Sequence, residues 1–161
     1  MLPVAPIVRI QQADFDIAAE TAGLIAGRTD VGAVVSFLGL CRGEAGALEA
    51  LELEHYPGMA EAEILRIAGE ALARWPLQGV TIIHRVGKIR PGENIVLVLA
   101  ASGHRQTAFD AAAFLMDFLK SRAPFWKKQH RADGSGGGWV DAKHSDHAAL
   151  ARWDVNETPQ R

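Results

Sequence analysis

The sequence is poor in cysteine and has no marked excess of charge of either sign. Its single cysteine, Cys41, cannot form a disulfide within the chain, which fits a protein of the reducing cytoplasm. Lysine and arginine number 17 against 19 aspartates and glutamates, so the formal net charge is -2. A chain without a global basic field is not expected to bind nucleic acid, and any anion-binding site must be local.

Long hydrophobic stretches are absent as well. The longest wholly apolar run extends from Ile95 to Ala101 and is far too short to span a bilayer. The N-terminus lacks the basic start and the long apolar region of a signal peptide, so we expect no membrane association. A length of 161 residues, 48% of them hydrophobic, suits one globular domain. We place this domain at residues 1–153 and expect a disordered tail over 154–161.

The spacing of hydrophobic residues predicts an α+β fold, because helices and strands do not alternate strictly enough for a doubly wound sheet. The segment 33–38 is almost wholly apolar and predicts a strand buried on both faces. Leu65 is assigned to the core-facing stripe of its helix, and Ser102 is expected to cap the helix that follows it. The expected strands are 4–10, 33–38, 48–55, 80–86, 94–101, 125–131 and 139–142. The expected helices start at Asp14 or Asp16 and run to about 26, then cover 60–74, 104–121 and 145–153.

The segment 114–129 is the hardest to explain by architecture alone. It begins as an apolar helix, which Pro124 ends because its ring disfavours helical geometry at the preceding residue. Lys120 lies near the end of this helix and Lys127 just past the turn, so both ammonium groups can face one pocket. A single lysine there is explained by the helix dipole alone. Two lysines beside the aromatic residues after the proline suit an anionic, ring-shaped or carboxylate-bearing ligand.

Three further basic residues are candidates for binding an anion. His104 and Arg105 lie where a predicted strand ends and a helix begins, a place where free backbone N–H groups attract anions. The helix dipole disfavours a cation there, so a functional role is the better interpretation of Arg105. Arg42 lies in a glycine-rich loop, where a solvated arginine and a binding arginine are equally good interpretations.

Neither the cysteine nor the histidines predict a metal or redox centre. A thiolate at Cys41 beside Arg42 would suit sulfur transfer, but a small buried apolar residue is the better interpretation. The glycine run at 134–138 lacks the lysine-threonine ending of a phosphate loop. No metal site is predicted, since no metal-binding spacing connects the histidines, and those on predicted strands are interpreted as structural. The histidines without a metal-binding spacing are His55, His84, His130, His144 and His147, and the two interpreted as structural strand residues are His55 and His84.

The segment from Phe118 to Lys127, Phe-Leu-Lys-Ser-Arg-Ala-Pro-Phe-Trp-Lys, closely resembles a signature of the molybdopterin synthase large (catalytic) subunit family. Further segments match in the same order, and together they cover roughly residues 30 to 153. One departure lies in the basic loop, where the family pattern Gly-Lys-x-Arg reads Gly39-Leu-Cys-Arg42 and Leu40 replaces the lysine. The other matching segments are Gly32-Ala-Val-Val-Ser-Phe37, Leu53-Glu-His-Tyr-Pro-Gly-Met59, Arg74-Trp-Pro-Leu77, Ile83-His-Arg-Val-Gly87, Arg90-Pro-Gly-Glu93 and Phe109-Asp-Ala111.

The resemblance implies a fold, a reaction and partners. The fold is a single-domain, α/β-hammerhead-like α+β fold with a mixed, mostly antiparallel sheet and about three helices. The reaction moves sulfur onto cyclic pyranopterin monophosphate to form the dithiolene of molybdopterin. The sulfur arrives as a thiocarboxylate on the C-terminal glycine of a small ubiquitin-like partner, and two large subunits form a homodimer within a heterotetramer. No cofactor is implied, because the sulfur is already loaded on the partner.

The resemblance also implies roles for the candidate residues. Lys120 and Lys127 are the catalytic candidates. One holds and polarises the thiocarboxylate and the other transfers protons at the pterin, and which lysine has which role stays open. Arg42, His104 and Arg105 are the candidates for binding the substrate phosphate. Two other functions also stay open, a non-catalytic module that docks a ubiquitin-like tail and a nucleotide-binding transferase with the same basic pocket.

Overall fold

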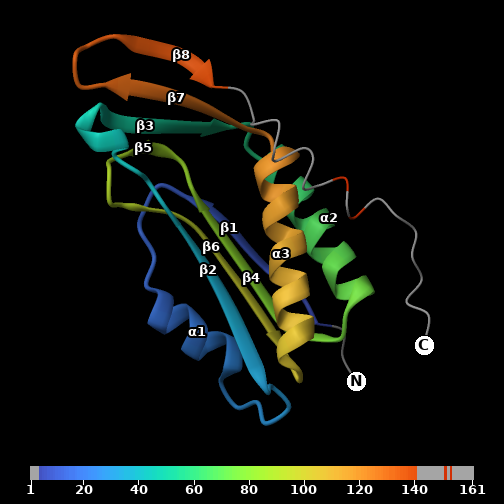
Figure 1. The fold of residues 1–161 in the computed structure, drawn as a ribbon. Helices are drawn as coiled ribbons and strands as arrows, with labels where there is room; N and C mark the ends of the chain where they lie inside the picture. The colour runs from blue at the N-terminus through green and yellow to red at the C-terminus, as the bar shows by residue number, and fades with distance from the viewer. Residues whose placement is uncertain (1–3, 141–150, 152, 154–161) are drawn as a thin grey trace.

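The computed structural model describes residues 4–140, 151 and 153, which form two four-stranded sheets and three α-helices (Figure 1). Sheet A consists of β1 Ile7–Gln11, β4 Leu77–Arg85, β6 Asn94–Ser102 and β2 Ala33–Leu40, in that order. Sheet B consists of β5 Gly87–Ile89, β3 Leu48–His55, β7 Phe125–Arg131 and β8 Gly136–Val140, in that order. The helices are α1 Ile17–Ile25, α2 Met59–Arg74, α3 Arg105–Ser121 and a short 3-10 turn, η1 Glu44–Gly46.

Sheet A carries the main core between its two central strands and the helices. Strand β1 pairs with β4 in parallel, while the β4–β6 and β6–β2 pairs are antiparallel. Alternate side chains of β4 point to opposite faces, so Ile82 packs toward α2 and α3 while Ile83 packs toward α1. Phe114 of α3 is fully buried between the helices and the sheet. Packing against the apolar central strands β4 and β6 thus fixes where α3 lies.

Sheet B is antiparallel throughout and crosses the end of sheet A at which α3 finishes (Figure 1). Its own core is small and consists of four buried residues, Cys41, Leu48, Leu53 and Ile89. No described helix covers the side of sheet B that points away from sheet A (Figure 1). One face of sheet B is therefore exposed, while the other closes over the end of α3.

The α+β prediction is confirmed, with mixed, mostly antiparallel pairing and three helices. Asp16, one of two predicted caps, caps α1 by accepting a hydrogen bond from the Ala19 N–H at 3.1 Å. The strands lie in two sheets rather than one, because β3 and β7 pair with each other and with β5 and β8, and not with the strands of sheet A. The predicted strands at 125–131 and 139–142 correspond to β7 and β8, which pair as an antiparallel hairpin, although β8 already begins at Gly136.

The prediction that 33–38 is buried on both faces is wrong. Strand β2 extends to Leu40 and pairs only with β6, at the edge of sheet A in the described part of the chain. Phe37 and Leu40 are 37% and 51% exposed. An apolar run predicts a buried strand on average, but an edge position removes one neighbour from it.

Two smaller predictions are also wrong. Leu65 is 45% exposed, and Ile67 takes the buried position on α2 instead. Ser102 does not cap α3, since His104 is the N-cap residue and has no side-chain capping bond. The Ser102 hydroxyl accepts a hydrogen bond from the His104 N–H at 3.4 Å and donates to the Pro76 carbonyl at 3.0 Å, which ties β6 to the turn before β4.

Several predictions concern residues outside the described part. These are the helix at 145–153 apart from residues 151 and 153, the tail at 154–161, and His144 and His147. Within the described residues, no helix is both long enough and apolar enough to cross a membrane.

Candidate functional site

A cavity of about 560 Å³ lies between the end of α3, the loop after β2 and the face of sheet B that points toward sheet A. Six of its lining residues carry the chemistry or shape the wall: Arg42, His84, Met116, Lys120, Phe125 and Lys127. They come from four separate parts of the sequence. The fold thus brings together three of the five predicted site residues, both lysines and Arg42.

Lys120 reaches the cavity because α3 ends there. It lies in the last turn of the helix, where a cation is favoured by the dipole. The helix closes with a hydrogen bond from the Arg122 N–H to the Phe118 carbonyl at 2.8 Å, and Pro124 prevents its continuation. The chain then turns directly into β7, which returns along the cavity.

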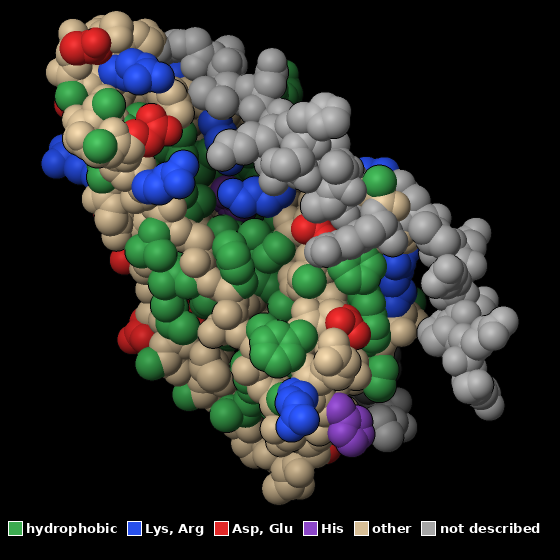
Figure 2. Space-filling model, viewed as in Figure 1, with side chains coloured by type: hydrophobic (Ala, Val, Ile, Leu, Met, Phe, Trp, Pro, Cys, Tyr) green, Lys and Arg blue, Asp and Glu red, His purple; other side chains and the backbone are tan. Residues whose placement is uncertain are grey.

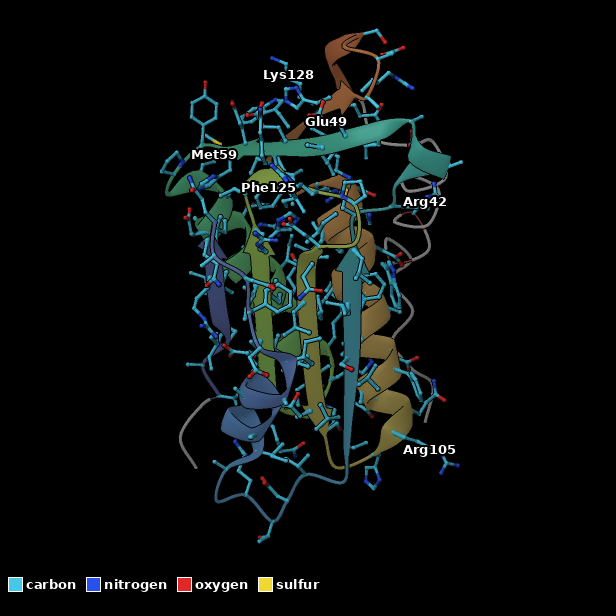
Figure 3. All side chains as sticks on the ribbon, turned by 90° about the vertical axis from the view of Figure 1, so that its left-hand side faces the viewer. Arg42, Glu49, Met59, Arg105, Phe125 and Lys128 are labelled. Atoms are coloured by element: carbon cyan, nitrogen blue, oxygen red, sulfur yellow. The ribbon has the colours of Figure 1, made fainter. Side chains whose placement is uncertain are left out.

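Lys127 reaches the cavity because of strand alternation. It stands opposite Leu53 on β3, whose side chain is only 1% exposed, so both point to the inner side of sheet B. The next residue, Lys128, stands opposite Glu52 and points to the outer side. Figure 3 shows Phe125 and Lys128 on opposite sides of the sheet. Adjacent lysines therefore face different surroundings.

Arg42 is held at the rim of the cavity by the backbone of its loop. The neighbouring Cys41 accepts a hydrogen bond from the Gly92 N–H at 2.7 Å and donates its own N–H to the Glu93 carbonyl at 2.9 Å. Arg42 itself is exposed. The Cys41 side chain is 3% exposed, and burial together with the Glu93 carboxylate raises the pKa of its thiol. Both observations fit the interpretation of Cys41 as a packing residue.

His84 also lines the cavity, although sequence reasoning interpreted it as structural. It lies near the end of β4, is 7% exposed and stacks on Phe125 with ring centroids 3.9 Å apart. Burial lowers the pKa of His84 to about 4, and the positive charges of Lys127 and Lys120 act in the same direction. The ring is therefore neutral at pH 7. The sequence signals for it were a histidine on a largely apolar strand and its place in the matching segment 83–87.

The structure does not place His104 and Arg105 at this cavity. They lie at the N-terminal end of α3, exposed to solvent, whereas Lys120 lies in its last turn. With about 15 positions between Arg105 and Lys120 and a rise of 1.5 Å per residue, the two Cα atoms are about 22 Å apart. Figure 3 shows Arg42 and Arg105 at opposite ends of the helix. Within one chain, these residues cannot contact a small ligand held by Lys120.

The described lining of the cavity therefore includes three cations, Arg42, Lys120 and Lys127, the neutral ring of His84, and an aromatic wall at Phe125. Such a site suits an anionic ligand with a ring, and the lysines can stabilise negative charge that develops during a reaction. Among the described residues, no three His, Cys, Asp or Glu side chains lie together in a group that could hold a metal ion.

Comparison with known proteins identifies the family. The MoaE protein family model matches residues 10–122. The molybdopterin synthase catalytic subunit of Mesorhizobium japonicum is 75% identical over 150 residues, which cover 93% of this chain and 94% of that one. The molybdopterin biosynthesis MoaE protein of Burkholderia ambifaria has a solved structure that is 47% identical, with a TM-score of 0.80 over 94% of this chain and 99% of that one.

A more distant solved structure shares the fold. It is a chain of the protein–protein complex of subunits 1 and 2 of molybdopterin-converting factor from Helicobacter pylori, 19% identical, with a TM-score of 0.69 over 85% of this chain and 90% of that one. The family model, the high identity of the relatives and the shared fold agree along most of the sequence. The chain belongs to the MoaE protein family.

Proposed function

We propose that this chain is the catalytic subunit of a molybdopterin synthase and transfers sulfur to cyclic pyranopterin monophosphate. The observation that carries the proposal is the cavity in which Arg42 meets Lys120 and Lys127, although Arg42 lies far from both lysines in the sequence. The names of the relatives, a molybdopterin synthase catalytic subunit and a molybdopterin biosynthesis protein, support it. The sulfur donor is the C-terminal thiocarboxylate of a small ubiquitin-like carrier subunit.

Each transfer forms a carbon–sulfur bond on the pterin substrate in place of a carbon–oxygen bond, whose oxygen leaves that carbon. The carrier's carbonyl carbon loses its sulfur and takes an oxygen from water, so the carrier leaves with an ordinary carboxylate. Lys120 and Lys127 supply positive charge beside the thiocarboxylate, and a lysine can also deliver or accept a proton if its surroundings lower its pKa. The two lysines come from different elements, and so they can act on different atoms of the substrate.

Arg42 is proposed to bind the substrate phosphate, because a guanidinium forms strong paired hydrogen bonds with phosphate oxygens. His104 and Arg105 can join it only if a second copy of the chain brings them, since they lie about 22 Å from the Lys120 end of α3. In a two-fold symmetric dimer, residue i contacts residue j of the partner and j contacts i. An axis near the middle of α3 then places Arg105 of one copy beside Lys120 of the other.

The surface that would form this dimer is apolar. Phe109 on α3 is 56% exposed, and Phe37 and Leu40 on β2 are 37% and 51% exposed. Figure 2 shows hydrophobic side chains gathered in the middle of the face formed by β2 and α3. The outer edge of β2 has no strand partner in the described part of the chain and can pair with β2 of a second copy. We propose this homodimer, with one carrier subunit at each cavity, as the heterotetramer.

The buried, free thiol of Cys41 is compatible with a reducing compartment, and we propose that the assembly works in the cytoplasm. Reconstitution tests the function directly. The purified chain, the thiocarboxylated carrier and cyclic pyranopterin monophosphate are mixed, and the dithiolene product is measured. Product that forms only with the thiocarboxylated carrier supports the proposal. Binding of the carrier without any product would instead indicate a docking module.

Mixing two inactive variants tests the shared site. Lys120→Ala and Arg105→Ala chains each lose activity when alone, but a mixed dimer regains one complete site if Arg105 acts across the interface. After random exchange of subunits, about a quarter of wild-type activity is expected. The control is a chain that carries both Lys120→Ala and Arg105→Ala. Its dimers contain no complete site and stay inactive. Without recovery in the mixture, Arg105 has no role across the dimer.

A further inference from the structure

His84 has one ring nitrogen whose role is already fixed by the fold. Its Nδ1 atom lies 2.8 Å from the carbonyl oxygen of Arg85. A carbonyl oxygen only accepts hydrogen bonds, so Nδ1 must carry the hydrogen and donate it. Because the ring is neutral, the second nitrogen, Nε2, then carries a lone pair and no hydrogen.

The surrounding residues prevent the ring from exchanging these roles. Phe125 stacks on it with an angle of 14° between the ring planes, which restricts rotation. The carbonyl that accepts from Nδ1 belongs to Arg85, and the Arg85 guanidinium donates to the Gln12 and Asn94 carbonyls at 3.0 and 2.8 Å. The acceptor of the Nδ1 hydrogen is thus held in place by contacts on the other side of sheet A.

Nε2 is therefore a preset acceptor in the wall of a cavity otherwise rich in cations. Within the described part of the chain, the hydrogen bond of the His84 ring is made by Nδ1. A ligand held only by its negative groups would leave this acceptor unused, whereas a ligand with both an anionic group and N–H donors uses the whole site. Pterins carry several ring and exocyclic N–H groups.

The geometry points to His84 as a substrate-binding residue, whose Nε2 accepts a hydrogen bond from an N–H group of the pterin ring. This inference rests on the proposed function, which provides the pterin. His84 selects for a donor at one position of the ring, while the lysines and Arg42 bind the anionic groups. A pterin analogue with an acceptor at that position would face the His84 lone pair directly and bind poorly.

Two substitutions separate the two ring nitrogens. In His84→Asn the amide nitrogen takes the place of Nδ1 and can still donate to the Arg85 carbonyl, but nothing replaces Nε2. In His84→Gln the amide oxygen takes the place of Nε2, while the donor to Arg85 is lost. If His84 matters only for stability, His84→Gln should lower the free energy of unfolding more than His84→Asn does. If His84 binds the ligand, His84→Asn should lower the affinity more.

The affinity for cyclic pyranopterin monophosphate is measured by calorimetry without the carrier, so that no sulfur is transferred. His84→Asn is expected to weaken binding at least tenfold, about 1.4 kcal/mol, and His84→Gln by less than about threefold. His130→Asn is the matched control, because His130 pairs with Glu52 at 3.3 Å on the outer side of sheet B, away from the cavity. Wild-type affinity in folded His84→Asn would overturn the inference.

A second measurement needs no substitution. Nitrogen NMR of the wild-type imidazole reports which ring nitrogen carries the hydrogen and whether the other accepts a bond. The Nε2 signal is expected to shift toward its hydrogen-bonded value when the pterin binds, while Nδ1 stays protonated. An unchanged Nε2 signal at saturating pterin also overturns the inference. If wild type neither binds the pterin nor forms product, the proposed function itself fails, which is a separate result.

Discussion

The two sides of sheet B use the same strands for opposite purposes. On the inner side, Leu53, Phe125 and Lys127 face the cavity and the small core. On the outer side, Glu52 and Lys128 face each other across β3 and β7 and are not covered by any described helix. Both sides carry a lysine from the same dipeptide. What distinguishes the lysines is the direction in which each points.

The different roles proposed for the two lysines rest on their different neighbours. Lys128 faces a carboxylate on an open sheet surface, where a cross-strand pair contributes only a few tenths to one kcal/mol. Lys127 faces a cavity shared with Lys120 and the neutral ring of His84. A cation in such a recess binds and polarises anions far more strongly than one on an open surface.

The largest expected difference between the two sides concerns turnover. Lys127→Ala and Lys120→Ala should each lower single-turnover sulfur transfer at least about a hundredfold, because each removes a positioned charge or proton donor. Lys127→Arg should recover little, since guanidinium keeps the charge but gives up no proton at working pH. Lys128→Ala is the control and should keep nearly the wild-type rate. Melting temperatures are recorded for all variants. Near-wild-type rates in both alanine variants would refute the catalytic role.

A second comparison concerns stability. Leu53 is 1% exposed on the inner side, so Leu53→Ala should lower the free energy of unfolding by about 2–5 kcal/mol. Glu54, the next residue, is exposed, and Glu54→Ala should change it by less than about 0.5 kcal/mol. Urea unfolding of both variants measures the difference. Equal effects would mean that the inner side of sheet B is not a core.

A third comparison concerns how stability depends on pH. The unfolded chain protonates His84 near its ordinary value of about 6.5, while the pKa of His84 in the folded protein is about 4. The folded state thus binds fewer protons between these values, and stability falls as pH decreases from about 6.5 to 4. The loss approaches about 3 kcal/mol at the acid end. His84→Asn should reduce this slope in urea titrations, and His130→Asn should keep it because it retains His84. An unchanged slope in His84→Asn would show that the histidine is not buried as a neutral ring.

The smallest effect is expected at Cys41, which packs in the small core under sheet B. Cys41→Ala should retain most of the sulfur-transfer activity, because the sulfur arrives on the carrier and the raised pKa of the thiol disfavours the thiolate. The rate is compared with wild type under conditions in which both are folded. A loss beyond about a hundredfold, or about 2.7 kcal/mol of barrier, would mean that the thiol takes part in the reaction.

Local patterns predicted much of the fold. The three helices, the cap at Asp16 and the β7–β8 hairpin follow from hydrophobic spacing, turn residues and the break at Pro124. The burial of individual side chains was less predictable. Phe37 and Leu65 are apolar yet exposed, because burial depends on which elements lie next to a residue and not on the residue alone.

The candidate site shows the same division. The sequence by itself determined that Lys120 lies at a helix end and that Lys127 lies beyond a proline turn, since both follow from local backbone preferences. Only the tertiary structure decided that Arg42 and His84 join them, and that His104 and Arg105 lie at the opposite end of α3. The pairing of β3 with β7 and the closure of sheet B over α3 connect residues far apart in the chain. Long-range pairing of this kind decides which polar residues share a cavity. It leaves no periodic signal in the sequence, and so the composition of the cavity could not be predicted from local patterns.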